Sequence, residues 1–272
     1  KHLKLLDFDD LEGRAVAPYK TLSTISIETP SETRTLPFKE EKSDIFSLMY
    51  SSGTTGKPKG IIVTKDNWKL DNIRNPIFFS PMIIVSYSAL AHAMDRMLIW
   101  QMVSNGGRTV FSPNYDRLFE TTQLVRPSLF VAMPNTWTKL YTKYQRLASA
   151  LGKEKAKEKM NKILGDRLFQ ISTGGGAISK EVLSWMGETF SCPVTNVYGS
   201  TEVSGISSNG TIRSGAKVKL VDVPSLGYLN SDKPRPRGEI VVQTTTMSPG
   251  YYKEPEKTKT VFVDGWYHSG DI

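Results

Sequence analysis

The sequence predicts an α/β fold with layered, mostly parallel sheets, followed by a smaller β-rich subdomain. Strand-like and helix-like segments alternate up to about residue 205, which is typical of parallel sheets with helical crossovers. After Gly205, short strands around Pro and Gly turns take over, with hardly any helix. The 272 residues, 39% of them hydrophobic and 23% charged, are sufficient for a sizeable core. We therefore expect residues 1–205 to form part of an α/β core and 206–272 a β-rich subdomain of the same large domain.

The elements can be justified in chain order. Residues 1–42 are expected to form loops and short edge strands. "IFSLMYSS" (45–52) and "GIIVT" (60–64) are apolar runs on either side of a polar loop and predict a hairpin. "MIIVSYS" (82–88) is rich in β-branched residues and predicts a buried strand. "HAMDRMLIWQMV" (92–103) has apolar residues at helical spacing, and "SNGG" after it is a signal that ends helices.

The middle of the chain repeats the same alternation. "RTVFS" (108–112) and "SLFVAMP" (128–134) predict strands, and "LFETTQLVRP" (118–127) between them predicts a helix that its proline ends. "NTWTKLYTKYQRLASAL" (135–151) predicts a helix with Asn135 as its N-cap.

A third round of strand and helix follows. The lysines of "GKEKAKEKMNK" (152–162) alternate with Glu and indicate a solvated helix face. "RLFQISTGGGAIS" (167–179) predicts a strand that runs into a glycine loop, and "SKEVLSWMGETF" (179–190) a helix with Ser179 as N-cap. "PVTNVYGSTE" (193–202) predicts a strand into a polar loop. The last part has three short strand-like runs: "AKVKLVDV" (216–223), "GEIVVQT" (238–244) and "GWYHSGDI" (265–272).

Charge and cysteine content narrow the function classes. The formal net charge of +8 favours an anionic partner such as a nucleotide, a phosphorylated cofactor or an acidic membrane surface. No basic tract or aromatic RNA-binding motif is present, so nucleic acid is not expected. The single cysteine, Cys192, excludes an internal disulfide framework and is compatible with a reducing compartment, so we expect a cytoplasmic location. The most apolar stretch, 76–94, is interrupted by prolines, hydroxyls and His92; we expect no membrane span, while peripheral membrane contact stays open.

Three polar or glycine-rich loops follow predicted strands, at 51–60, 173–179 and 198–205. In doubly wound sheets, ligands bind beyond the carboxyl ends of strands, where backbone N–H groups and helix N-termini gather. One such loop proves little, because strand–glycine–helix turns are common. Three of them in one domain favour a shared site over three unrelated turns.

The first loop, "SSGTTGKPKG" (51–60), is not a Walker A loop. That motif needs four residues between its first glycine and the Gly-Lys pair, whereas only two threonines separate Gly53 from Gly56. The physical requirements of phosphate binding are still met, because glycines allow close approach while hydroxyls and lysines supply hydrogen bonds and charge. A polar hairpin tip remains the alternative on these residues alone.

The loop resembles the phosphate-binding signature of the adenylate-forming enzymes, and three further motifs follow in the family's order. "STGGGAIS" resembles the adenine-side glycine loop, "VYGSTE" the Tyr-Gly-x-Thr-Glu motif, and "GWYHSGDI" the Trp/Tyr-x-x-(Thr/Ser)-Gly-Asp strand. Within the family, "LAHAMDRM" is similar to long-chain acyl-CoA synthetases and carboxylic acid reductases. "KLVDVPSLGYLNSDKPRPRGEIVVQT" with "MSPGYYKEPEKT" most resembles the reductase adenylation domains.

The resemblance implies ATP-dependent activation of a carboxylic acid, fatty or aromatic, as acyl-AMP with release of pyrophosphate. A thiol of CoA or of a phosphopantetheine arm on a carrier domain then forms a thioester. Magnesium would bridge the phosphates. The resemblance also implies an incomplete large domain, with the family's mobile C-terminal subdomain and its second lysine outside these 272 residues, and with the segment between Lys59 and His92 shorter than usual.

The resemblance assigns roles to individual residues. Glu202 would hold Mg²⁺ and Thr201 would touch the α-phosphate; a helix N-terminal carboxylate is the alternative for Glu202. Tyr198 would stack on adenine, although a half-buried strand tyrosine is common, and Asp271 would bind the ribose hydroxyls unless it only caps a turn. The full set expected to bind nucleotide is Ser51, Ser52, Gly53, Thr54, Thr55, Gly56, Lys57, Lys59, Gly174, Gly175, Gly176, Ala177, Tyr198, Gly199, Ser200, Thr201 and Asp271.

His92 has two interpretations. A lone histidine in an apolar stretch is often a core residue whose ring bonds a backbone carbonyl. The resemblance instead implies an imidazole beside the substrate carboxylate, which it orients or neutralises. Two other functions also remain open: a stand-alone long-chain acyl-CoA synthetase, and a nucleotide-binding module without catalysis.

Overall fold

The predicted hairpin is confirmed by the computed structural model, which describes residues 44–51, 58–68 and 82–272. Strand β1 (Ile45–Ser51) pairs with β2 (Lys59–Thr64) in antiparallel register, and the short helix α1 (Lys65–Trp68) follows. The expectation of loops and strands at 1–42 lies outside the described residues. Met49, Val63 and Trp68 form a small core on which α2 packs through Ala93 and Met97, so the hairpin is fixed to the α/β core.

The α/β core contains parallel strands joined by helices, as predicted. Strand β3 (Ile83–Ser86) runs parallel to β4 (Arg108–Phe111), with α2 (Ala93–Asn105) between them in the chain. Helix α2 ends where Gly106 adopts a left-handed conformation with φ 71°, which confirms the expected stop. Helix α3 (Leu118–Val125) leads to the next sheet.

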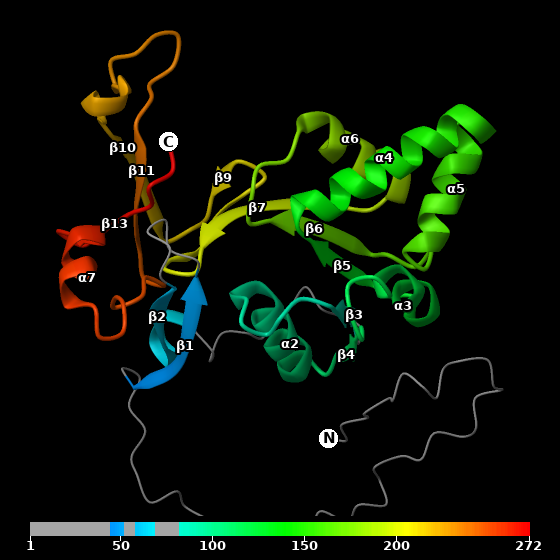
Figure 1. Cartoon of the computed structure of the whole chain (residues 1–272), viewed down its shortest axis with the longest axis horizontal. Helices are drawn as coiled ribbons and strands as arrows, with labels where there is room; N and C mark the ends of the chain where they lie inside the picture. Colours follow the sequence, from blue (N-terminus) through cyan, green and yellow to red (C-terminus); the bar gives the residue numbers. More distant parts are fainter. Residues whose placement is uncertain (1–43, 52–57, 69–81) are drawn as a thin grey trace, which may run out of the picture.

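A five-stranded sheet follows, with the order β5-β6-β7-β8-β9. Strands β5 to β7 are parallel, whereas β8 and β9 are antiparallel additions, so the sheet has mixed orientation. Figure 1 shows α4, α5 and α6 on one side of these strands and α2 and α3 on the other. The elements are β5 (Leu129–Ala132), α4 (Pro134–Leu151), α5 (Lys153–Ile163), β6 (Gln170–Gly174), α6 (Lys180–Phe190), β7 (Val194–Ser200), β8 (Ser204–Ser208) and β9 (Thr211–Ile212).

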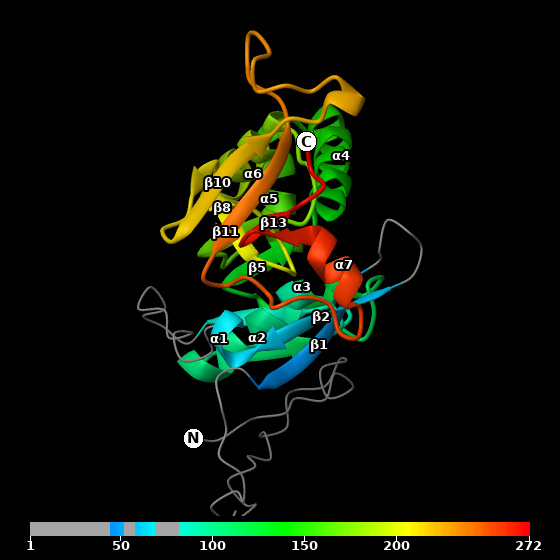
Figure 2. The ribbon, with the colours of Figure 1, turned by 90° about the vertical axis from the view of Figure 1, so that its left-hand side faces the viewer.

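The last part forms a separate antiparallel sheet of order β10-β11-β13-β12. Figures 1 and 2 place it beside the β1–β2 hairpin and the end of β7. Strands β8 and β9 continue the preceding sheet, and the new sheet begins at Ala216, so a domain division near residue 205 stays a prediction. Its elements are β10 (Ala216–Val221), a 3-10 turn (Pro224–Leu226), β11 (Glu239–Thr244), α7 (Pro255–Val261), β12 (Phe262–Val263) and β13 (Trp266–His268).

The main core is aromatic and sits between the five-stranded sheet and its covering helices. Trp137 is fully buried, packs edge-on against Phe130 at 5.5 Å between ring centroids, and donates its indole N–H to the Ser172 carbonyl at 3.2 Å. Burying a ring of this size contributes about 2–3 kcal/mol. These contacts join α4 to β5 and β6, so they fix the strand ends from which the loops emerge.

The two predicted helix caps differ in outcome. Ser179 caps α6, since its Oγ accepts a hydrogen bond from the Val182 N–H at 3.2 Å, as predicted. The prediction for Asn135 was wrong: α4 begins at Pro134, with Met133 at the cap position and no side-chain bond. Proline suits the first helical position because it needs no N–H partner there.

The charged helix also has a buried side. Ala156, Met160 and Ile163 of α5 are buried, while most of its lysines and glutamates are exposed. This confirms the predicted solvated face of the helix. Within the described part of the chain, none of the helices combines the length and apolarity needed to cross a bilayer.

Candidate active site

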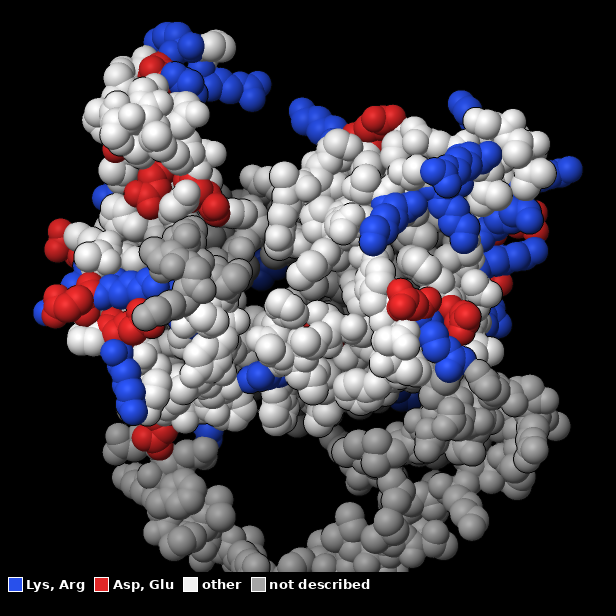
Figure 3. Space-filling model, in the orientation of Figure 1, with Lys and Arg blue, Asp and Glu red and all other residues white. Residues whose placement is uncertain are grey.

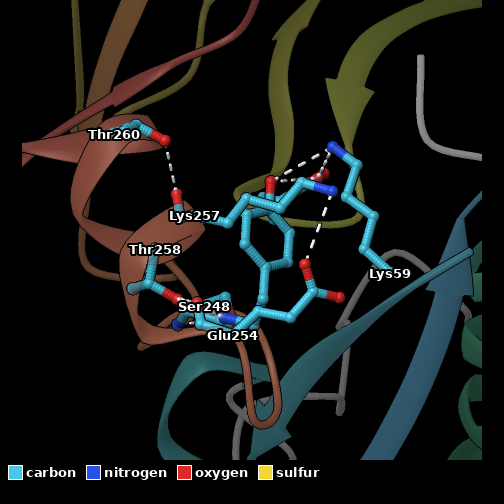
Figure 4. Close-up of polar contacts among 9 residues, drawn as sticks. Lys59, Ser248, Glu254, Lys257, Thr258 and Thr260 are labelled. Atoms are coloured by element: carbon cyan, nitrogen blue, oxygen red, sulfur yellow. Dashed lines mark hydrogen bonds and ion pairs between the residues drawn. The ribbon is translucent and has the colours of Figure 1, made fainter. Parts of the chain in front are cut away.

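Two predicted site residues, 143 positions apart in the chain, meet at the start of β2. The Lys59 ammonium donates to Glu202 Oε1 at 3.4 Å and to the Tyr251 hydroxyl at 3.2 Å, and that hydroxyl donates to the same Oε1 at 3.0 Å. Glu202 is only 4% exposed. Figure 4 shows Lys59 reaching from β2 toward the α7 side of this cluster. A lysine near the end of the 51–60 segment is therefore held against the acidic residue of the Tyr-Gly-x-Thr-Glu motif.

The segment 248–252 builds this cluster by pairing with β2. The Ile62 N–H donates to the Gly250 carbonyl at 3.0 Å, and the Tyr252 N–H donates to the Gly60 carbonyl at 2.7 Å. Ser248 adds two bonds: its N–H donates to the Glu202 carbonyl and its hydroxyl to the Ile62 carbonyl, both at 2.7 Å. Hydrogen bonds thereby connect the β-rich part to both the β1–β2 hairpin and the β7–β8 turn.

Two buried tyrosines surround the Glu202 carboxylate. Burial, with the nearby Glu202 charge as the next cause, raises the pKa of both Tyr251 and Tyr267 well above the usual phenol value. Both hydroxyls therefore keep their protons at neutral pH, and Tyr251 remains a donor to Glu202. Lys59 and Lys257 lie over the ring of Tyr251, 4.9 and 5.7 Å from its centroid (Figure 4). The Lys59 ammonium thus lies at the Glu202 carboxylate, whereas Lys257 pairs with Glu254 at 3.6 Å.

Glu202 lies in the tight turn between β7 and β8, not at the start of a helix. This position contradicts the alternative in which it interacts with a helix dipole. The same turn needs glycine at position 199, because a Cβ there would lie 2.1 Å from the Ser204 carbonyl oxygen. Ser200 and Thr201 complete the turn and are partly buried beside Glu202.

The residues expected at adenine and ribose are bonded to each other. Tyr198, half-buried at the end of β7, donates its hydroxyl to Asp271 Oδ2 at 2.7 Å. Burial first, and the bond to Asp271 second, raise the pKa of Tyr198 to about 12. The Asp271 backbone carbonyl accepts from the Ile240 N–H of β11 at 2.9 Å, which positions the exposed carboxylate. Strand ends from two sheets therefore converge here.

The glycine loop after β6 combines a fixed start with an open end. A Cβ at Gly174 would lie 2.7 Å from the Val197 carbonyl oxygen of β7, so only glycine allows the strands to approach this closely. Gly175, Gly176 and Ala177 are exposed, and a Cβ at Gly176 would come 3.7 Å from Pro134, the first residue of α4. The loop therefore lies next to the start of α4.

A cavity of about 430 Å³ opens at the same place. Its walls come from the segment after β3, the start of α2, the end of β5 and the start of α4, which is where parallel strands end and helices begin. His92 lines it at the N-cap of α2 and is exposed, so it is not a core histidine. The lining residues are Tyr87, Ser88, Ala89, His92, Met94, Asp95, Leu98, Tyr115, Val131, Met133, Asn135, Thr136 and Lys139.

A buried acid lies at one wall of this cavity. Asp95 is 5% exposed, and its Oδ2 accepts a hydrogen bond from the Ser86 hydroxyl at 2.6 Å. Burial raises the pKa of Asp95 above the usual carboxyl value, against the opposing effects of Ser86 and of His92. His92 and Asp95 therefore both line the cavity, and the charge interaction with His92 lowers the pKa of Asp95.

Part of the predicted nucleotide site lies outside the described residues: Ser52, Gly53, Thr54, Thr55, Gly56 and Lys57. Ser51 and Lys59 on either side of this segment are paired in the hairpin register. The Ser51 hydroxyl is buried and has no hydrogen-bond partner among the described residues. An unpaired buried hydroxyl at the end of β1 is consistent with a polar ligand at this position.

Sequence reasoning missed Tyr251, Ser248 and Tyr267 as site residues. "MSPGYYKEPEKT" was informative only as a branch mark, since no chemistry singles out one tyrosine of the pair. The cavity residues Tyr115 and Lys139 were missed as well, because they lie on segments that sequence describes only as loop and helix.

The chain belongs to the AMP-binding enzyme family, whose model matches residues 5–252. A carboxylic acid reductase of Mycobacterium marinum is 36% identical over 243 residues, covering 83% of this chain and 21% of that protein. Fatty acyl-CoA synthetase A of Dictyostelium discoideum is 30% identical, covering 84% of this chain and 41% of that protein. The resemblance to these two branches is confirmed.

Solved structures agree on the fold. The A-PCP didomain of carboxylic acid reductase from Segniliparus rugosus, in complex with AMP, matches with a TM-score of 0.78 at 31% identity, over 87% of this chain and 36% of that chain. The adenylation domain of a Mycobacterium chelonae carboxylate reductase matches with a TM-score of 0.76 at 29% identity, over 85% and 39%. The chain spans between 21% and 41% of the relatives named here.

The donor set suits magnesium held mainly by phosphates. Among the described residues there is no group of three or more His, Cys, Asp or Glu side chains that could hold a metal by themselves. The buried carboxylate of Glu202 pairs with Lys59, the first residue of β2 in the β1–β2 hairpin. Magnesium in nucleotide sites commonly takes one or two carboxylates and completes its shell with phosphate and water, so Glu202 fits that requirement.

Proposed function

We propose that this chain provides the ATP- and acid-binding part of an enzyme that activates a carboxylic acid as acyl-AMP. The observation that supports it most strongly is the convergence of Lys59, Glu202, Tyr198 and Asp271 from distant segments, with the glycine loop beside an open cavity. Membership of the AMP-binding enzyme family supports the same reaction.

In this proposal, the carboxylic acid binds in the cavity that His92 lines, with its carboxylate beside the imidazole. A carboxylate oxygen attacks the α-phosphorus of ATP; the new O–P bond forms as the bond to the β-phosphate bridge breaks, and pyrophosphate leaves. Both reactants are anions, so fixed positive charge and positioning supply most of the catalysis. Lys59, with residues 51–57, binds the β- and γ-phosphates. Glu202 would hold a magnesium ion, which would supply further positive charge there.

The remaining residues hold the nucleoside. The Thr201 hydroxyl donates a hydrogen bond to the α-phosphate. The Asp271 carboxylate gives up its hydrogen bond from Tyr198 and accepts hydrogen bonds from the ribose hydroxyls instead. The ring of Tyr198 and the exposed backbone of Gly175, Gly176 and Ala177 enclose adenine. Because those three positions lack side chains beyond a methyl group, they leave a flat surface between the nucleoside and the cavity.

The acceptor in the second step is a thiol of CoA or of a carrier domain, which displaces AMP. The reductase-like branch is favoured, because identity to the M. marinum reductase is higher than to the acyl-CoA synthetase and one structural match is a didomain with PCP. A stand-alone long-chain acyl-CoA synthetase is the second candidate. Supplying free CoA or a phosphopantetheinylated carrier to preformed acyl-AMP, and following the thioester, separates the two.

The test is exchange of labelled pyrophosphate into ATP by the full-length protein across a panel of fatty and aromatic acids. We expect exchange that depends on the acid and on magnesium. Exchange with none of the acids would contradict the proposal. If ATP binds in calorimetry but no acyl-AMP forms, the chain is a nucleotide-binding module without catalysis.

A further inference from the structure

The hydroxyl of Tyr251 has an unusual position, since it contacts both charges of the Lys59–Glu202 pair. It donates to Glu202 Oε1 at 3.0 Å and accepts from the Lys59 ammonium at 3.2 Å, while the ion pair itself is longer, at 3.4 Å. Tyr251 is 3% exposed. Each of its two hydrogen bonds is therefore shorter than the direct contact between the charged groups.

Several contacts besides the hydroxyl bonds hold this tyrosine in place. Its backbone pairs with Ile61 in an isolated antiparallel bridge, and its N–H donates to the Thr258 hydroxyl at 3.0 Å. Its ring packs against Phe262 with the centroids 5.8 Å apart. Two ammonium groups lie over the ring, so its position does not depend on the hydroxyl alone.

In the proposed reaction, the Glu202 carboxylate interacts with two cations in turn, the Lys59 ammonium and a magnesium ion. In the structure this carboxylate is paired with Lys59, yet the proposed reaction requires it to face a metal ion while the lysine binds phosphate. A buried carboxylate that loses its partner is strongly destabilised unless another donor holds it. A neutral donor that stays in place throughout meets this need, because it keeps the carboxylate oriented without competing for its charge.

We propose that Tyr251 is a positioning residue that holds Glu202 in place while the carboxylate passes from Lys59 to the magnesium of bound ATP. This inference rests on the proposed function. It assigns to the "GYY" segment a role in metal-dependent nucleotide binding that its place in the β-rich part does not suggest.

The experiment compares Tyr251→Phe with Tyr252→Phe. The first removes only the hydroxyl and keeps the ring beneath both lysines; the second removes the neighbouring hydroxyl, on a residue that is 39% exposed. Calorimetry measures ATP affinity with magnesium and with a chelator, and circular dichroism checks folding. We expect Tyr251→Phe to reduce the gain in affinity that magnesium gives by about tenfold, as expected for loss of a hydrogen bond to a charged group. Affinity in chelator should be nearly unchanged, and Tyr252→Phe should match the unmodified protein.

A double-mutant cycle with Glu202→Gln separates positioning from a structural role. If Tyr251 acts through Glu202, Tyr251→Phe adds no further loss of the magnesium effect in the Glu202→Gln background. An equal loss in both backgrounds, or an unchanged magnesium effect in a folded Tyr251→Phe protein, would overturn the inference while leaving the proposed function intact. Failure of the unmodified protein to bind ATP under either condition would overturn both.

Discussion

The cluster around Glu202 and the cavity around His92 differ in how their polar groups are satisfied. At the cluster, a buried carboxylate already has an ammonium and a tyrosine hydroxyl as partners within 3.4 Å. At the cavity, the histidine is exposed and borders about 430 Å³ of open space. Under the proposed function, the carboxylate assigned to magnesium is already held by protein partners, whereas the cavity assigned to the acid is open.

The largest expected effect tests the cavity side. His92→Ala removes the imidazole that lines the cavity but none of the contacts around Glu202. We expect acyl-AMP formation to fall about 100-fold through loss of positioning, with ATP affinity retained. Rate measurements at saturating ATP, together with calorimetry, check this. Parallel loss of both properties in a folded variant would mean that the two regions are not separate.

An intermediate effect concerns the nucleoside contacts. Tyr198→Phe keeps the ring and removes its hydroxyl bond to Asp271. That carboxylate is exposed, so we expect ATP affinity to change by only about threefold, much less than a buried contact would give. A fluorescent ATP analogue provides the measurement. A change of a hundredfold or more would show that the hydroxyl, and not the ring, carries the interaction with nucleotide.

The smallest effect concerns stability at the cavity wall. Burial raises the pKa of Asp95 in the folded protein, so the folded state disfavours its charged form. The penalty on folding therefore grows as the pH rises from the usual carboxyl pKa to the folded pKa of Asp95, and keeps its full size at higher pH. Asp95→Asn keeps an acceptor for the Ser86 hydroxyl and should raise the thermal midpoint at neutral pH, with less gain near pH 4, close to the usual carboxyl pKa. A variant less stable than the parent at pH 7 would contradict this.

Much of the α/β core follows from local patterns, and the reasons are visible in particular residues. A β-branched run predicted β3, and Ser179 caps its helix because its hydroxyl lies at the start of an apolar-periodic segment. Asn135 was misplaced because a proline immediately before it takes the first helical position. Such errors of one or two residues leave the strand ends, and so the loops, correctly placed.

Motifs pointed to some of the residues that meet in the structure, and packing alone brings the others to them. Glu202, Tyr198 and Asp271 lie within recognisable motifs, and they do meet partners at the predicted strand ends. Tyr251 became visible only through the pairing of its segment with β2, a contact across 190 residues of chain that no local pattern records. Tyr115 and Lys139 are brought to the cavity in the same way, by the packing of elements around it.

The central claim is that a carboxylate oxygen reaches phosphorus in this protein. It is tested most directly by supplying an acid labelled with ¹⁸O in both carboxyl positions, adding a thiol acceptor, and analysing the released AMP by mass spectrometry. Attack on the α-phosphorus followed by displacement at the acyl carbon predicts one heavy oxygen in AMP. Unlabelled AMP, or none at all, with every acid in the panel would contradict it.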